Sequence, residues 1–254
     1  MISIGIDIGS VCTKAVAFDG DIVKRLIAPT GWNPRETGRE LYEKLVSDCA
    51  LSGSDISAVV ATGYGRVSVP FATKKVTEIT CHARGAAFLE PYTRTVIDVG
   101  GQDSKVIAVD EKGNVLEFMM NDKCAAGTGR FLQVMANVLE TEIDQLEGLA
   151  SGSEPRDINS MCAVFAESEV VSLLAQGTSK EAVASGILYS ISNKITHLAS
   201  RVAVRDAVLF TGGVASNNLV KEIIARKLKC KVLTHKDSQF AGAIGAAIIG
   251  FTQN

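Results

Sequence analysis

An internal repeat constrains the fold of this 254-residue chain more than any other feature. Residues 5–14, GIDIGSVCTK, align without gaps with residues 96–105, VIDVGGQDSK. In each copy an apolar strand delivers an acid, Asp7 or Asp98, to a glycine turn, and a second apolar strand follows. Folding alone does not explain these acids, because a buried carboxylate without a partner is costly. The repeat therefore predicts two equivalent hairpins with a shared chemical role.

Both hairpins have the composition of a phosphate-binding turn. Turns with little side-chain bulk let backbone N–H groups approach phosphate oxygens, and a carboxylate beside them can hold hydrated Mg2+. Two such hairpins facing each other would clamp the phosphates of ATP or ADP. Gln102 and Asp103 follow the second turn, where a side chain can orient an attacking water. The expected catalytic residues are Asp7, Asp98, Gln102 and Asp103, and the expected cofactor-binding residues of the turns are Gly9, Ser10, Val11, Cys12, Thr13, Gly100 and Gly101.

A third glycine-containing segment follows a buried strand at 207–211. The strand ends at Gly212 and Gly213, and a helix is predicted to start nearby. The two glycines allow a flat ligand to lie against the backbone, so adenine or ribose is the expected occupant. A plain strand-to-helix turn is the alternative.

Composition excludes several classes of protein. The net charge is -2 and there is no basic run, so nothing points to nucleic acid. The most apolar run, residues 240–251, is shorter than the roughly 20 residues that span a bilayer. The chain starts with a strand and lacks a charged start or cleavage site, which favours a cytoplasmic location. Its six cysteines are not expected to form disulfides in a reducing compartment, and they include no C-x-x-C pair, which argues against a single-chain zinc or ferredoxin site.

Hydrophobic periodicity predicts an α/β chain with two lobes. The first lobe is expected at 1–93 and the second at 94–237, with a hinge near 91–95 and the C-terminal segment 238–254 packing back on the first lobe. The predicted strands are 2–8, 12–18, 22–28, 57–62, 95–99, 104–110, 115–119, 207–211 and 231–234, and the predicted helices are 36–51, 81–90, 128–139, 162–176, 179–201, 216–228 and 238–250.

Two cysteines, Cys124 and Cys162, each lie just before a predicted helix. The start of a helix carries partial positive charge and free N–H groups, which favour a thiolate or a bound anionic cluster. Two thiols cannot hold a four-iron cluster, but two chains related by a twofold axis supply four, the usual ligand count. Buried apolar filler is the alternative role for any one cysteine.

Four segments resemble those of one family: DVGGQDSK at 98–105, NDKCAAGTGRF at 121–131, CAVFAESE at 162–169 and FAGAIGAA at 240–247. This family contains the ATP-dependent activators (archerases) of 2-hydroxyacyl-CoA dehydratases, relatives of the ATPase subunits of benzoyl-CoA reductase. The resemblance covers almost the whole chain. It implies a duplicated actin/hexokinase-like (ribonuclease H-like) ATPase fold and a homodimer that shares one [4Fe-4S] cluster, ligated by Cys124 and Cys162. Cys12, Cys49, Cys81 and Cys230 receive no cluster role.

The resemblance also implies a function. A reduced ferredoxin or flavodoxin would load one electron, and ATP hydrolysis would drive its transfer to a partner iron–sulfur reductase or dehydratase. A small-molecule (sugar-type) kinase of the same fold is the alternative, and a filament-forming actin relative is a second one. Some side chains keep two possible roles. Lys14 and Lys105 can contact phosphate or pair with an acid, Glu167 and Glu169 can face a nucleotide or solvent, and Thr128 is expected to cap a helix rather than touch nucleotide.

Overall fold

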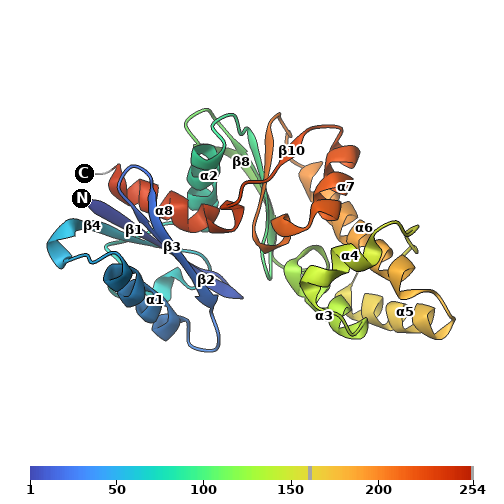
Figure 1. The fold of residues 1–254 in the computed structure, drawn as a ribbon. Helices are drawn as coiled ribbons and strands as arrows, with labels where there is room; N and C mark the ends of the chain where they lie inside the picture. The colour runs from blue at the N-terminus through green and yellow to red at the C-terminus, as the bar shows by residue number, and fades with distance from the viewer. Residues whose placement is uncertain (160–161, 253–254) are drawn as a thin grey trace. The chain divides into compact units, whose positions relative to one another are not determined.

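The structure is a computed structural model that describes residues 1–159 and 162–252. The chain divides into two compact units (Figure 1). Unit 1 contains Met1–Val96, Ile107–Phe118 and the described residues from His235 onward, and unit 2 contains Ile97–Val106 and the described residues of Met119–Thr234. The predicted lobe boundaries and the hinge between them stay a prediction.

A five-stranded sheet forms the centre of unit 1. Its strand order is β3-β2-β1-β4-β5, with β1 antiparallel to β2 and parallel to β4. β2 and β3 are antiparallel, and β5 pairs in parallel with β4. The strands are β1 (Ile2–Ile8), β2 (Cys12–Phe18), β3 (Ile22–Pro29), β4 (Ile56–Thr62) and β5 (Lys74–Lys75).

Both faces of this sheet are covered, which explains why β1 is buried along almost its whole length. Helix α1 (Pro34–Asp48) packs on one face and α8 (Ala241–Phe251) on the other, as Figure 1 shows. Leu41 and Leu45 of α1 share a core with alternate residues of β1, namely Ile4, Ile6 and Ile8.

The residues of β1 between these isoleucines face α8, because side chains alternate along a strand. A β-carbon at Gly5 would lie 2.0 Å from the Ala243 carbonyl oxygen, and one at Gly250 would lie 2.2 Å from Ser3 Oγ. The Gly/Ala spacing of α8 therefore reflects close backbone packing against β1 and against α2 (Glu78–Leu89). Asp7, the next residue on this face, points to the same helix.

The second sheet has the order β10-β9-β6-β7-β8. Its strands are β6 (Thr95–Val99), β7 (Ser104–Val109), β8 (Val115–Asn121), β9 (Val208–Thr211) and β10 (Val232–Leu233). The helices of unit 2 are α3 (Gly129–Val138), α4 (Leu146–Ala150), α5 (Ala163–Ala175), α6 (Lys180–Ala199) and α7 (Asn218–Leu228). Helix α6 packs against the other four and is largely buried.

The elements agree with the sequence-based prediction to within a few residues. Helix α2 begins at Glu78, earlier than predicted, because Thr77 caps it by accepting from the Thr80 N–H at 3.4 Å. Among the described strands and α-helices, β5 and α4 were not predicted, since segments this short show no periodicity. None of the described helices is both long and apolar enough to cross a bilayer.

Candidate functional site

The first hairpin joins β1 to β2 through a turn at residues 9–12. The Gly9 N–H donates to the Cys12 carbonyl oxygen at 3.2 Å and closes the turn. Thr30, the residue after β3, makes two hydrogen bonds to the turn. Its hydroxyl donates to Gly9 O at 2.7 Å, and its N–H donates to Val11 O at 2.8 Å. The Thr13 hydroxyl lies 3.0 Å from that of Thr30. Two carbonyl groups of this turn, those of Gly9 and Val11, therefore accept hydrogen bonds from Thr30.

The second hairpin repeats this geometry at the equivalent positions. The Gly100 N–H donates to Asp103 O at 2.9 Å, as Gly9 does to Cys12. Here the start of α3 replaces Thr30, because the Gly129 and Arg130 N–H groups donate to Gly100 O and Gly101 O, both at 2.9 Å. The sequence repeat is thus also a structural repeat.

Asp98 is buried at the end of β6, and both of its carboxylate oxygens have polar partners. Lys105 Nζ lies 3.3 Å from Asp98 Oδ2, and the Thr211 hydroxyl donates to Asp98 Oδ1 at 2.9 Å. Lys105 also lies 2.7 Å from Asp103 Oδ1 and so bridges two of the predicted catalytic acids. A buried carboxylate tolerates desolvation when it is paired and hydrogen-bonded in this way.

Asp7 occupies the equivalent place in the first hairpin with a looser ion pair. Lys14 Nζ lies 3.8 Å from Asp7 Oδ2. Both hairpin lysines, for which the sequence left a phosphate and an acid as possible partners, therefore pair with the acid of their own hairpin. The loop after β4 packs against the other carboxylate oxygen of Asp7, Oδ1. A β-carbon at Gly63, where φ is +82°, would lie 2.3 Å from this oxygen.

The two glycines after β9 have different roles. Gly212 has a φ of +86°, and a β-carbon there would lie 2.3 Å from Val99 O. The fold itself therefore requires Gly212. A β-carbon at Gly213 would meet no atom within 4 Å, so this position faces open space. Gly213 is the one that leaves room for a flat ligand.

Gln102 and Asp103 differ in how far they are available to a water molecule. The Gln102 side chain is exposed, whereas Asp103 is half-buried with its carboxylate held by Lys105. A group that orients water must be able to reach it, so Gln102 is the better placed of the two.

Cys124 and Cys162 are both exposed, and neither forms a disulfide. Cys124 precedes a short 3-10 turn, Ala125–Gly127, and its N–H donates to Asn121 Oδ1 at 3.2 Å. Cys162 is the residue before α5, and its carbonyl accepts from the Ala166 N–H at 2.9 Å. Among the residues that the structure describes, no group of three or more His, Cys, Asp or Glu side chains is arranged to hold a metal ion. The predicted shared site needs only two thiols from each chain.

Thr128 occupies the N-cap position of α3, as predicted, but its side chain does not cap the helix. Its hydroxyl donates to Ala125 O at 2.7 Å instead of accepting from an α3 N–H. The carbonyls of the second hairpin already accept the first N–H groups of that helix, which leaves the hydroxyl no capping partner. Glu169 accepts from the Asn159 N–H at 3.0 Å, and Glu167 is exposed.

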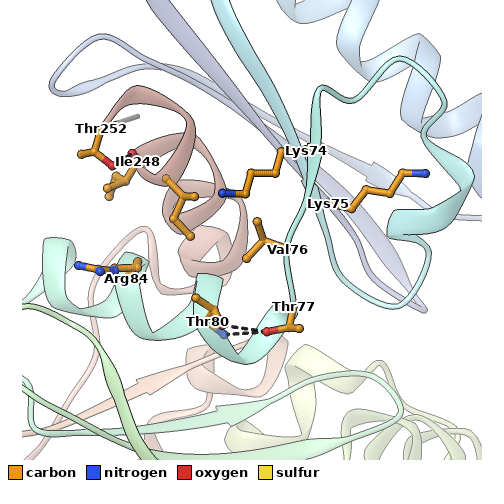
Figure 2. Close-up of a pocket in the computed structure, with 9 residues that line it drawn as sticks. Lys74, Lys75, Val76, Thr77, Thr80, Arg84, Ile248 and Thr252 are labelled. Carbon is orange, nitrogen blue, oxygen red and sulfur yellow. Dashed lines mark hydrogen bonds between the residues drawn. The ribbon is translucent and has the colours of Figure 1, made fainter. Parts of the chain in front are cut away.

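A cavity of about 640 Å3 lies elsewhere in unit 1 (Figure 2). Figure 2 shows Lys74 directed toward α8 and Lys75 directed away from it. Lys75 Nζ donates to Val67 O at 3.4 Å, and the Arg84 guanidinium donates to Lys112 O and to Asn114 Oδ1. The hairpin residues do not line this cavity, so it is not the predicted nucleotide site. Its lining residues are Lys74, Lys75, Val76, Thr77, Thr80, Arg84, Ile248, Ile249 and Thr252.

Sequence reasoning missed the residues that support the hairpins from other elements. Thr30 and Thr211 are buried polar side chains that lie outside the hairpin they bond to. Thr211 carried the clearest signal, as a polar residue at the end of a buried strand directly before the glycine pair. A single threonine otherwise gives no pattern in a sequence.

Comparison with known proteins identifies relatives along the whole chain. The profile of the BadF/BadG/BcrA/BcrD ATPase family matches residues 4–250. The activator of lactoyl-CoA dehydratase from Anaerotignum propionicum is 44% identical over 254 residues, which cover 99% of this chain and 98% of that protein. The activator of the 2-hydroxyisocaproyl-CoA dehydratase from Clostridium difficile, solved with bound ADPNP, has a TM-score of 0.92 and 40% identity, and the match covers 100% of this chain and 95% of that one.

Solved structures with much lower sequence identity share the fold of this chain. A ROK family glucokinase from Streptomyces griseus has a TM-score of 0.57 at 16% identity, over 98% of this chain and 99% of that one. These neighbours confirm the actin/hexokinase-like fold expected from the sequence. At this identity the glucokinase shares the fold alone, so it gives no support to the kinase alternative.

Proposed function

Because the chain belongs to the BadF/BadG/BcrA/BcrD ATPase family, we propose that it is an ATP-hydrolysing activator that delivers a low-potential electron to a partner iron–sulfur dehydratase or reductase. The observation that carries this proposal is the pair of exposed cysteines Cys124, before the 3-10 turn that leads into α3, and Cys162, before α5, in a chain that also has two phosphate-type hairpins. The named relatives activate dehydratases of 2-hydroxyacyl-CoA compounds, and one was solved with an ATP analogue.

In this proposal both hairpins contribute to ATP binding. In each turn two carbonyl groups accept hydrogen bonds from outside the turn, from Thr30 in the first and from the start of α3 in the second. We expect the other backbone N–H groups of these glycine-containing turns to bind phosphate oxygens. Asp7 and Asp98 are the expected carboxylates for hydrated Mg2+. The exposed glycine face at Gly213 suits adenine or ribose.

Hydrolysis transfers the γ-phosphoryl group of ATP to a water molecule. The oxygen of that water forms a bond to γ-phosphorus, the bond from phosphorus to the bridging oxygen breaks, and ADP, inorganic phosphate and a proton released to solvent result. Gln102 would orient the water, as an exposed amide beside the second turn. Lys105 would hold Asp98 and Asp103 in place through its two ion pairs.

The donor set of this chain fits half of a [4Fe-4S] site. Cys124 and Cys162 are solvent-accessible thiols and belong to the same unit. Two chains would supply the four thiolates that such a cluster requires. When bound, the cluster supplies the storage and transfer of one electron. The residues of this chain supply the thiolates, and the N–H groups at the start of α5 favour negative charge near Cys162.

The electron would come from a reduced ferredoxin or flavodoxin and pass to the partner enzyme. One donor molecule is oxidised by one electron for each electron that the partner gains, and ATP hydrolysis makes the transfer one-way.

The test is the iron and acid-labile sulfide content of anaerobically purified protein, with the visible absorption recorded before and after air. About four irons per two chains are expected. The Cys124→Ser and Cys162→Ser variants should lose them, and Cys230→Ser, at a half-buried cysteine with no proposed role, should keep them.

A colourless, air-stable protein that stays free of iron after reconstitution but still binds ATP would contradict the proposal. A phosphotransfer ATPase without a cluster would then be the better account.

A further inference from the structure

Asn121, the last residue of β8, bonds the backbone of Cys124 with both ends of its side-chain amide. Asn121 Nδ2 donates to Cys124 O at 2.8 Å, and the Cys124 N–H donates to Asn121 Oδ1 at 3.2 Å. An asparagine amide offers a donor and an acceptor at once, and here both meet the same residue. Two bonds from one side chain fix the orientation of the Cys124 backbone as well as its position.

Burial does not supply this constraint at Cys124. The cysteine itself is exposed, and so are the two residues between it and Asn121. These two, Asp122 and Lys123, pair with each other, with Lys123 Nζ 3.3 Å from Asp122 Oδ2. An exposed ion pair of this kind stabilises little. The position of Cys124 relative to β8 is therefore set in part by the half-buried Asn121 side chain.

The residues that follow Cys124 pack against the second hairpin. The 3-10 turn Ala125–Gly127 is buried at its second and third residues. A β-carbon at Gly127 would lie 3.5 Å from Asn121 Nδ2 and 3.6 Å from the Oγ of Ser104, the first residue of β7. The turn thus lies in ordinary contact with both Asn121 and the second strand of the hairpin.

The segment around Cys124 is therefore anchored at both of its ends. At one end is Asn121 on β8, which lies beside β7 in the sheet. At the other end the Gly129 and Arg130 N–H groups of α3 donate to the turn of the second hairpin. A ligand that is held in place before it binds loses less conformational freedom on binding. An exposed thiol on such an anchored segment suits a ligand that is shared with a second chain.

We propose that Asn121 is a positioning residue that holds Cys124 where its thiolate binds iron. It acts through the Cys124 backbone, and no contact between Asn121 and iron is part of the proposal. This inference rests on the proposed function, because it takes Cys124 as a ligand of the shared cluster. Residues that orient the ligands of a metal site typically change metal affinity or activity 10- to 100-fold when they are lost.

The test compares three variants of the full chain. Asn121→Ala removes both hydrogen bonds to Cys124. Asn121→Ser differs from it by one oxygen, which can still accept from the N–H three residues on. Asn33→Ala is the matched control, because the Asn33 side chain also bonds a backbone N–H, that of Glu36 at 3.3 Å, but in unit 1.

The main measurement is the rate at which a ferrous-iron chelator removes iron from the anaerobic, reconstituted protein, followed by visible absorption. Asn121→Ala should lose iron roughly 10- to 100-fold faster than the natural chain. Asn121→Ser should lie between the two, and Asn33→Ala should match the natural chain. Calorimetric ADP binding should be unchanged in both Asn121 variants, because the backbone N–H groups of α3 still hold the turn of the second hairpin.

Three results would overturn the inference. One is the natural rate of iron loss in Asn121→Ala or, if that variant does not fold, in Asn121→Ser. Another is equally fast loss from the Ala and Ser variants, which would leave the hydrogen bond to the Cys124 N–H without effect. The third is a rate that follows the unfolding temperature alone, with Asn33→Ala as fast as Asn121→Ala. A natural chain that takes up no iron would instead contradict the proposed function, and this inference with it.

Discussion

Lys105 reaches Asp98 with its ammonium 3.3 Å from Oδ2, and both side chains are almost wholly buried. The same ammonium lies 2.7 Å from Asp103 Oδ1. In the first hairpin the equivalent pair, Lys14 and Asp7, is longer at 3.8 Å, and the lysine side chain is 14% exposed. The two hairpins therefore share a backbone geometry, but their lysine–aspartate ion pairs differ in length and burial and so in strength.

This asymmetry predicts different effects of removing the two lysines. Lys105→Met leaves Asp98 buried without its counter-charge and should lower the free energy of unfolding by about 3–5 kcal/mol. Lys14→Met should cost clearly less, because its pair is longer and closer to solvent. Urea denaturation of both variants measures the difference, and equal losses would show that burial of the pair does not decide its strength.

Substitutions at the two glycines after β9 should have different effects, on stability at Gly212 and on ligand binding at Gly213. Gly213→Ala adds a methyl group in open space and should weaken ADP binding without a change in unfolding temperature. Gly212→Ala should destabilise the fold itself, because its φ is +86° and its β-carbon would meet Val99 O. Calorimetric titration and thermal unfolding of both variants are the measurements. Unchanged ADP binding in Gly213→Ala would place the adenosine elsewhere.

Gln102 should matter for chemistry and not for stability. Its side chain is exposed, so Gln102→Ala should leave the unfolding temperature unchanged. If it orients the attacking water, kcat for ATP hydrolysis should fall by about 10²-fold with little effect on KM. An unchanged kcat would remove Gln102 from this role and leave Asp103 or the Gly63–Arg66 loop as candidates.

Cys81 should be the least reactive thiol. Burial, with a smaller contribution from the charge of Asp7, raises the pKa of the Cys81 thiol from 9.0 to about 12. Because the thiolate is the nucleophile, Cys81 should resist alkylation of the native protein at pH 8, while the exposed Cys124 and Cys162 react in the iron-free protein. Mass spectrometry of the alkylated peptides gives the order of reaction.

The same shift predicts a pH dependence of stability. The folded chain keeps the Cys81 proton to a higher pH than the unfolded chain does. The stabilisation that comes from keeping Cys81 protonated is therefore complete below about pH 9, and it is lost as the pH rises toward about 12. The free energy of unfolding should fall more steeply above pH 9 in the natural chain than in Cys81→Ala. Parallel slopes for the two proteins would contradict the prediction.

The sequence alone determined the local elements, the two hairpins and the family. Alternation of apolar residues predicts strands, and the repeat of acid, glycine and lysine places equivalent groups at equivalent turns. The fold and the family are confirmed by the comparisons. The shared cluster, the homodimer and the roles of Cys124 and Cys162 stay predictions, because they concern groups and chains beyond one chain's own folding.

Tertiary structure decided which side chains hold the acids. Thr211 donates to Asp98 from a segment far away in sequence, and the first N–H groups of α3 donate to the carbonyls of the second hairpin and not to the side chain of Thr128. Local patterns record the period of a helix or strand. They do not record which helices approach closely enough to place one polar atom beside another, because that depends on packing between distant segments, such as the backbone contact of α2 with α8.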